Sequence, residues 1–365
     1  MLSRRNELRL YQRSDRKRTV SPSTQTVDIQ GRQLQLSNLD KVLYPEAGFS
    51  KGQVIDYYVR IAPALLPHLH DRPLTMKRYP NGVSGQFFYE KNCPSHRPEW
   101  VQTASVWSEG NNRYMNYCLV QDLPTLVWAA NLADIELHTS LSLGHDILQP
   151  TMLVFDLDPG APANIVQCCQ VGLWVREIFE HFGLKCFAKT SGSKGLQVYV
   201  PLNTPISYEQ TKAVAHAIAR HLEDEHRELV VSDMKKALRV NKVLVDWSQN
   251  DDHKTTICVY SLRARERPTV STPVEWAEVE RCLEKKDPKL LVFDSGDVLK
   301  RVEAKGDLFK PVLELKQKLP ALGAVAGGEE AATESSPAKR AAPAKSAKAV
   351  RSRASRKTSR RARSG

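Results

Sequence analysis

The sequence predicts an α+β fold in which a mixed or antiparallel sheet is flanked by helices. Short apolar runs bounded by turn residues, such as 152–160 and 243–247, are typical of buried strands. Between such runs, apolar residues three and four positions apart, from Val171 to Phe182, indicate helices. The strands cluster around three aspartates, so we expect the sheet to carry the functional face.

The individual elements follow from local patterns. Residues 26–36 alternate apolar and polar side chains about a glycine and predict a hairpin. Ser50 and Gln53 form a capping box that begins a helix. The remaining predicted elements are a helix over 124–133, a strand over 135–138, a strand ending at Asp158, a helix ending at Gly183, strands near 186–187 and 196–200, a helix over about 208–225, a strand pair at 243–247 and 255–260, and helices near 274–283, 298–304 and 309–319.

Composition divides the 365 residues into three parts. We expect residues 1–22 to form a basic extension and residues 321–365 a tail rich in Lys, Arg and Ala, both disordered because they can bury little apolar surface. Residues 23–320 carry regular apolar runs and predict one large domain or two closely joined subdomains.

The positive charge is concentrated at the two ends of the chain. The net charge is +12, of which residues 1–20 contribute +5 and residues 331–365 contribute +10, so residues 21–330 carry −3. A basic tail is typical of a protein that binds a polyanion such as nucleic acid. A solubilising or signal-like tail is the other interpretation.

The seven cysteines include no Cys-x-x-Cys pair, and we expect reduced, mostly packed thiols of a cytosolic protein. No apolar run is long enough to cross a bilayer, so no membrane partner is expected.

Asp156 and Asp158 follow an apolar run and are two residues apart, so their side chains share one face of the predicted strand, whereas Leu157 points into the core. Asp246 follows a second run. Three clustered carboxylates favour hard cations, and two Mg²⁺ or Mn²⁺ ions would suit phosphoryl transfer. The other interpretation of Asp-x-Asp is a turn or cap, because Pro159 and Gly160 follow it.

Several nearby segments suit a polyphosphate ligand. Residues 189–196 form a Gly/Ser turn between two strands, in which Ser191, Ser193 and Lys194 offer donors to a triphosphate. Basic residues recur nearby and suit phosphate geometry; they are Lys77, Arg78, Arg239, Arg263 and Arg265. Phe87, Phe88 and Tyr89 could stack on the bases of a template, although we expect at least one of these rings in the core.

The chain resembles the polymerase domain of bacterial ligase D, within the archaeo-eukaryotic primase superfamily. The matching segments run in family order over about residues 30–310; they are 39–45, 54–58, 76–82, 153–160, 190–195, 245–250, 254–256 and 260–263.

The resemblance implies a primase-polymerase-like catalytic domain that adds nucleoside triphosphates, often ribonucleotides, to DNA during end joining. It implies that Asp156, Asp158 and Asp246 bind two Mn²⁺ or Mg²⁺ ions, and that Lys41 and Lys51 hold a 5′-phosphate. The resemblance places His138, Ser191, Lys194, Arg239 and Arg263 around the nucleotide. We add six other residues to this predicted nucleotide site: Lys77, Arg78, Ser193, Gln197, Gln249 and Arg265.

It further implies DNA with gaps or broken ends as a partner, with Ku and a separate ATP-dependent ligase as possible protein partners, and a cytoplasmic, nucleoid-associated location in a bacterium. The sequence has no Lys-x-Asp-Gly motif, so we expect no ligase activity.

One departure from the family pattern is Gln197, which stands where the family usually has histidine. Glutamine donates a hydrogen bond but cannot carry a proton or a positive charge. Gln197 and the basic tail leave one alternative open, a module that binds DNA ends or gaps with weak or no catalysis. Asp-x-Asp leaves another, a metal phosphatase, although such an enzyme gives no reason for the lysine and aromatic segments.

Overall fold

The computed structural model describes residues 24–320. The predicted basic extension, residues 1–22, and the predicted tail, residues 321–365, lie outside the described residues. None of the helices between residues 24 and 320 is long and apolar enough to cross a bilayer.

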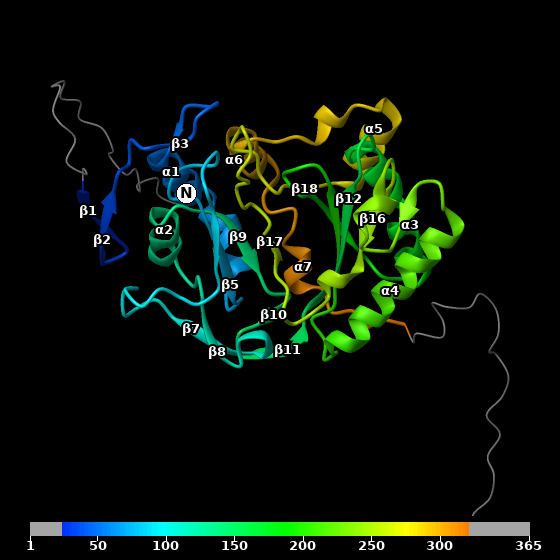
Figure 1. Cartoon of the computed structure of the whole chain (residues 1–365), viewed down its shortest axis with the longest axis horizontal. Coiled ribbons are helices and arrows are strands. Elements are labelled where there is room, and N and C mark those ends of the chain that lie inside the picture. The colour runs from blue at the N-terminus through cyan, green and yellow to red at the C-terminus, as the bar shows by residue number, and fades with distance from the viewer. Residues whose placement is uncertain (1–23, 321–365) are drawn as a thin grey trace, which may run out of the picture. The chain divides into compact units, whose positions relative to one another are not determined.

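The predicted aspartates lie in a six-stranded sheet, which we call the aspartate sheet (Figure 1). Its strand order is β15 (Val230–Val231), β16 (Val243–Asp246), β12 (Met152–Pro159), β14 (Leu196–Pro201), β13 (Phe187–Thr190) and β18 (Pro273–Val274). The β15–β16 pair is parallel and the other pairs are antiparallel, so the sheet is mixed, as predicted.

A second six-stranded sheet carries the other half of the predicted site. Its order is β17 (Thr256–Ile257), β9 (Asp134–Thr139), β5 (Leu74–Arg78), β8 (Arg113–Cys118) and β7 (Thr103–Ser108), and β6 (Phe88–Glu90) pairs with β5. The α+β prediction is therefore confirmed, with two sheets in place of one. The other strands of the described part of the chain form three pairs: β1 (Thr24–Ile29) with β2 (Arg32–Ser37), β3 (Val42–Tyr44) with β4 (Phe49–Ser50), and β10 (Ser142–Leu143) with β11 (Asp146–Pro150).

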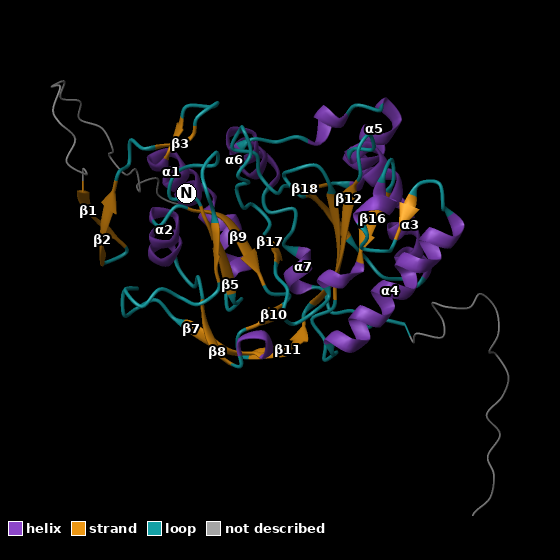
Figure 2. Cartoon of the chain, in the orientation of Figure 1, coloured by secondary structure: helices purple, strands orange, loops and turns teal. Residues whose placement is uncertain are grey.

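Helices pack on both sheets (Figure 2). The buried apolar residues form two clusters, and the cluster of the second sheet also includes Met152, Val154 and Tyr199 of the aspartate sheet. The helices α3 (Ile165–His181), α4 (Tyr208–Glu225) and α5 (Trp276–Lys285) share a core with the aspartate sheet. The helices α1 (Lys51–Leu69) and α2 (Leu123–Asn131) pack with the second sheet, and α6 (Ser295–Lys305) and α7 (Pro311–Glu314) contribute residues to the same core. Within residues 24–320 there are also four short 3₁₀ turns: η1 (Glu109–Asn111), η2 (Lys236–Arg239), η3 (Trp247–Gln249) and η4 (Pro288–Leu291).

Local signals explain where the helices begin. Ser50 and Gln53 form the predicted reciprocal capping box of α1. Ser207 with Gln210 does the same for α4, which spans the predicted residues. The helix predicted for residues 309–319 is shorter than expected, because the chain after α7 runs beside β14, where Gln317 N donates to Leu202 O at 2.8 Å.

The predicted pairing of residues 243–247 with 255–260 is wrong. β16 pairs with β12 and β15 in the aspartate sheet, whereas β17 pairs with β9 in the second sheet. The two segments are close in sequence, but the chain between them contains η3 and turns, and it carries β17 to the other sheet.

The cysteine prediction also needs correction. Cys93 and Cys118 form a disulfide, while the other five cysteines are free and buried, as expected. The two partners are 25 residues apart, so their spacing gave no sign of the bond. A backbone hydrogen bond of 2.6 Å from Cys93 N to Asn116 O brings the segment after β6 against β8 and places the thiols together.

Candidate active site

The three aspartates meet through strand register. Asp156 lies directly opposite Asp246 in the antiparallel ladder of β12 and β16, so their side chains share a face of the sheet. Leu157 is fully buried on the opposite face, as predicted, which leaves Asp158 on the face of Asp156.

The three carboxylates carry more negative charge than the neighbouring lysine and arginine side chains neutralise. Burial and the neighbouring Asp246 carboxylate raise the pKa of Asp156 to about 6. Asp158 is better compensated, because its carboxylate lies 3.3 Å from Lys194 Nζ and 3.6 Å from an Arg239 guanidinium nitrogen. A cation held between Asp156 and Asp246 would remove the repulsion that raises the Asp156 pKa.

The turn after β16 fixes Asp246. Its Oδ1 accepts hydrogen bonds from Ser248 N at 2.9 Å and Ser248 Oγ at 2.6 Å, and its Oδ2 accepts one from Gln249 Nε2 at 2.9 Å. The buried Asn250 amide then bonds both backbone groups of Val154, at 2.9 and 2.8 Å. The Asp246 turn is thereby attached to β12, the strand that carries the other two aspartates.

These donors fit divalent cations that prefer oxygen ligands, because all three side chains are carboxylates. Within residues 24–320, a tighter acidic group is formed by Asp251, Asp252 and His253, whose ligand atoms lie within 4.8 Å of one another. Asp251 in that group already pairs with Lys212 Nζ at 2.6 Å. The uncompensated charge at Asp156 makes the aspartate sheet the better fit for a metal ion.

The predicted Gly/Ser turn closes over the end of β12. Ser191 Oγ accepts hydrogen bonds from Ser193 N at 3.3 Å and Gly195 N at 3.1 Å. A Cβ at Gly195 would lie only 2.3 Å from the Leu157 carbonyl oxygen, so glycine is required where the turn approaches the aspartate strand. Gly192 has φ +66°, a backbone conformation that also favours glycine.

A cavity of about 510 Å³ opens between these elements. Predicted residues that line it are Tyr89, His138, Asp156, Asp158, Ser191, Ser193, Lys194, Gln197, Gln249, Arg263 and Arg265. Its other lining residues include Lys91, His253 and Lys254, which our list of site residues did not contain. The predicted residues Lys77, Arg78, Arg239, Asp246, Phe87 and Phe88 are not among those that line it.

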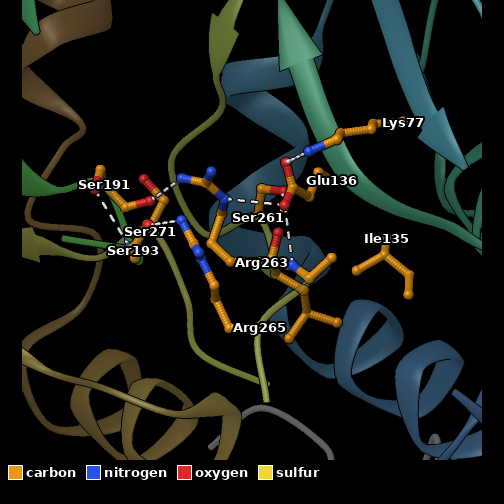
Figure 3. A network of polar contacts seen from close by, with 12 residues as sticks. Lys77, Ile135, Glu136, Ser191, Ser193, Ser261, Arg263, Arg265 and Ser271 are labelled. Atoms are coloured by element: carbon orange, nitrogen blue, oxygen red, sulfur yellow. Dashed lines mark hydrogen bonds and ion pairs between the residues drawn. The ribbon is translucent and has the colours of Figure 1, made fainter. Parts of the chain in front are cut away.

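The Glu136 side chain, on β9, contacts three of the predicted basic side chains, and Figure 3 labels two of them, Lys77 and Arg263. Only 2% of Glu136 is exposed. Its carboxylate lies 3.2 Å from Lys77 Nζ, 3.0 Å from His138 Nε2 and 3.3 Å from Arg263 Nε, the last as an ion pair without hydrogen-bond geometry. Burial alone would raise the Glu136 pKa, but the His138 hydrogen bond and the Arg263 and Lys77 charges hold it well below the usual value.

The same network joins the two sheets. Arg263 donates to the Ser191 carbonyl and Arg265 donates to Ser193 Oγ (Figure 3). Arg263 therefore connects Glu136 in the second sheet with the Gly/Ser turn of the aspartate sheet. Burial lowers the pKa of His138 despite its bond to Glu136.

The backbone that carries Arg263 is held by tyrosines. Tyr44 OH donates to the Arg263 carbonyl at 3.0 Å, and Tyr57 OH donates to the Tyr260 carbonyl at 2.8 Å. Tyr58 OH donates to Ile135 O at 2.7 Å and accepts from Leu262 N at 3.2 Å. These hydroxyls satisfy backbone groups of a segment that has little regular structure, and so fix the arginine.

Lys77 and Arg78 contact the aromatic segment as well as acidic groups. Lys77 Nζ lies 4.5 Å from the Phe87 ring centroid, and the Arg78 guanidinium lies 5.1 Å from that of Phe88. Arg78 also pairs with Glu90 at 2.6 Å. The three rings are 50%, 43% and 55% exposed at Phe87, Phe88 and Tyr89, so the expectation that one ring is in the core is wrong. Phe88 and Tyr89 lie on the short strand β6, which pairs with β5 alone.

Lys41 and Lys51 differ in their surroundings. Lys41 is exposed and donates to Asn81 Oδ1 at 3.2 Å. Lys51 is buried and donates to the Ser37 carbonyl at 2.7 Å. Burial, helped by the Lys41 and Arg78 charges, lowers the pKa of Lys51 to about 8. Their predicted role at a 5′-phosphate stays a prediction.

The comparisons with known proteins cover most of the chain. Residues 50–309 match the family model described as LigD, primase-polymerase domain. The chain is 40% identical over 281 residues to the multifunctional non-homologous end joining protein LigD of Mycolicibacterium smegmatis, covering 76% of this chain and 36% of that protein. It is 30% identical over 274 residues to the bifunctional non-homologous end joining protein LigD of Bacillus subtilis, covering 75% and 43%. The matched region is thus less than half of each relative's length.

A solved structure, the polymerase domain of Mycobacterium tuberculosis ligase D in complex with DNA, superimposes with a TM-score of 0.71 at 38% identity. The match covers 77% of this chain and 98% of that domain.

Proposed function

The chain belongs to the LigD primase-polymerase family, and from this premise we propose that it is a template-directed polymerase that fills gaps and remodels broken DNA ends. Family membership supports the coarser role, a nucleotidyltransferase in DNA repair. The observation that carries the finer proposal is the pairing of Asp156 with Asp246, next to a cavity that Asp156, Asp158 and Lys194 line.

The proposed residue roles follow from this geometry. Asp156, Asp158 and Asp246 hold two divalent cations, Mn²⁺ or Mg²⁺, which would neutralise charge as a primer 3′-hydroxyl displaces pyrophosphate from a nucleoside triphosphate. The Gly/Ser turn, with Ser191, Ser193 and Lys194, receives the triphosphate. Arg263, positioned by Glu136, adds positive charge beside it.

The surroundings of the cavity suit a nucleic-acid template. Tyr89 lines the cavity, and the neighbouring Phe87 and Phe88 rings are exposed to solvent, as stacking on single-stranded bases requires. We propose DNA with gaps or with 5′-phosphorylated ends as the partner, with Lys41 contacting the phosphate. The names of the relatives support end joining as the process, with Ku and a separate ATP-dependent ligase as proposed protein partners.

Primer extension on a gapped duplex that carries a 5′-phosphate tests the proposed polymerase function. The assay supplies Mn²⁺ or Mg²⁺ and either ribo- or deoxyribonucleotides. We expect extension that requires the metal ion. A protein that binds the gapped duplex but adds no nucleotide would support the alternative function, an end-binding module without catalysis, which Gln197 in place of the family histidine favours. Phosphate release without extension would indicate a phosphatase.

A further inference from the structure

Lys189 is a fully buried lysine on β13 that the proposed reaction does not use. Its ammonium group donates to Gln197 Oε1 at 2.5 Å, to Ser271 Oγ at 2.7 Å and to the Ile257 carbonyl at 3.0 Å. The ring centroid of Tyr199 lies 5.2 Å from the same nitrogen. All three ammonium hydrogens therefore have acceptors, and each acceptor is a neutral group.

Strand register places Lys189 in line with the aspartates. Lys189 lies opposite Gln197 in the β13–β14 ladder, Gln197 lies opposite Asp156 in the β14–β12 ladder, and Asp156 lies opposite Asp246 in the β12–β16 ladder. Directly opposed residues project from the same face of a sheet. These four side chains therefore form one row across four neighbouring strands.

The Gln197 amide connects the lysine to the carboxylates. An amide has one accepting and one donating end, and Lys189 occupies the accepting oxygen. Tyr199 OH donates to the same oxygen at 3.4 Å. The donating nitrogen is then left for Asp156, which lies directly opposite Gln197 in the β12–β14 ladder. If the amide turned over, its oxygen would face the carboxylate, and two acceptors would repel each other.

We propose that Lys189 is a positioning residue for the metal site, which fixes the Gln197 amide in the orientation that donates to Asp156. The proposal rests on the proposed function, because it assigns a role toward the cations that the aspartates would hold. Residues that orient a metal ligand in this way commonly change metal affinity by about 10–100-fold when they are replaced.

A positioning role and a purely structural role for Lys189 predict different effects of its replacement on the stability of the fold. A buried ammonium without a carboxylate partner opposes folding, and burial lowers the Lys189 pKa to about 7. Replacement by methionine, which has a similar length and no charge, should therefore leave the metal-free fold as stable as before or more stable. A lysine kept for stability would instead lower the unfolding temperature when it is replaced.

The experiment compares Mn²⁺ affinity by calorimetry with thermal unfolding in a chelator, using the full chain. We expect Lys189→Met to weaken Mn²⁺ binding by about tenfold or more with an unchanged or higher unfolding temperature. Lys189→Gln retains an N–H donor and should recover part of the affinity. The matched control Ser271→Ala removes another partner of Lys189 while leaving the Gln197 contact in place, and should bind Mn²⁺ as the wild type does.

A double variant tests whether the effect passes through Gln197. We expect Lys189→Met with Gln197→Met to bind Mn²⁺ no more weakly than Gln197→Met alone, because the lysine then has no amide to orient. Additive losses, unchanged affinity in Lys189→Met, or a lowered unfolding temperature in Lys189→Met would each overturn the proposal. A wild-type protein that binds no Mn²⁺ would overturn the proposed metal site itself, which is a distinguishable result.

Discussion

Asp156 pairs directly with Asp246 across the β12–β16 ladder, so two carboxylates from segments 90 residues apart occupy one face of the aspartate sheet. Gln197 stands on the other side of Asp156 in the same row. Burial and the neighbouring Asp246 carboxylate together raise the pKa of Asp156, and a divalent cation between the two carboxylates would relieve their repulsion.

The first prediction concerns Gln197→His. We expect little change in catalytic efficiency, because a neutral imidazole can accept from Lys189 on one nitrogen and donate to Asp156 from the other. A neutral hydrogen bond contributes only about 0.5–1.5 kcal/mol, whereas proton transfer by a general acid is worth ~10²–10⁴ in rate. Steady-state primer extension measures the difference, and a gain above roughly a hundredfold in kcat would favour the weak-catalysis alternative.

The second prediction concerns the buried carboxylate that pairs with Lys77, His138 and Arg263. Glu136→Gln keeps the shape but removes the buried negative charge that pairs with the partly buried Lys77 and Arg263, and breaking a buried ion pair typically costs about 3–5 kcal/mol of stability. We expect chemical denaturation to show that loss, and the KM for the nucleotide to rise. The control Glu180→Gln removes a carboxylate from a more exposed helical pair with Arg176 and should change stability by less than about 1 kcal/mol.

The same carboxylate predicts a pH dependence. The pKa of Glu136 is lower in the folded protein than usual, so its stabilising contribution is present above the ordinary glutamate value of about 4.3 and is lost as the pH falls toward the folded-state pKa. Unfolding free energies measured between pH 7 and pH 3 should fall less steeply in Glu136→Gln than in the wild type. Parallel curves would contradict the assignment.

The third prediction concerns the exposed aromatic rings. Phe88→Ala and Tyr89→Ala should each weaken binding to a duplex with a single-stranded overhang by about 1–3 kcal/mol, the usual contribution of one stacked base. Trp107→Ala is the matched control, because Trp107 is similarly exposed but lies on β7, at the far end of the strand order. Fluorescence anisotropy with a labelled overhang measures the affinities, and equal losses in all three variants would argue against a stacking platform.

The sequence predicted the elements better than it predicted their contacts. The alternation of Asp156, Leu157 and Asp158 was enough to place the carboxylates on one face, because side chains in a strand alternate with a period of two. The ladder that brings Asp246 opposite Asp156 depends on tertiary register, which local patterns do not contain. The same limit produced the wrong pairing of the β16 and β17 segments.

The missed residues are those whose neighbours come from distant segments. Glu136 alternates with apolar residues and looks like a solvated strand residue, yet ion pairs with Lys77 and Arg263 allow it to be buried. Lys189 gives no sign of burial in the sequence, because its acceptors come from residues 197, 257 and 271.

The fourth prediction concerns the 5′-phosphate. Lys41→Ala with Lys51→Ala should erase the preference for a phosphorylated 5′ end in binding to gapped DNA. The single variants separate two effects, because Lys41 is exposed while Lys51 is buried against the Ser37 carbonyl. We expect Lys41→Ala to reduce the preference without changing the unfolding temperature. A preference that survives in the double variant would place the phosphate contact elsewhere.

The central claim is that the aspartates hold the cations that nucleotide addition requires. The most direct measurement is single-turnover extension of a primer on a gapped, 5′-phosphorylated duplex by the wild type and by Asp158→Asn, which keeps the shape of the side chain but removes its charge. We predict metal-dependent extension by the wild type and none detectable with Asp158→Asn, while both proteins bind the duplex with similar affinity. Extension at the wild-type rate by Asp158→Asn would contradict the account.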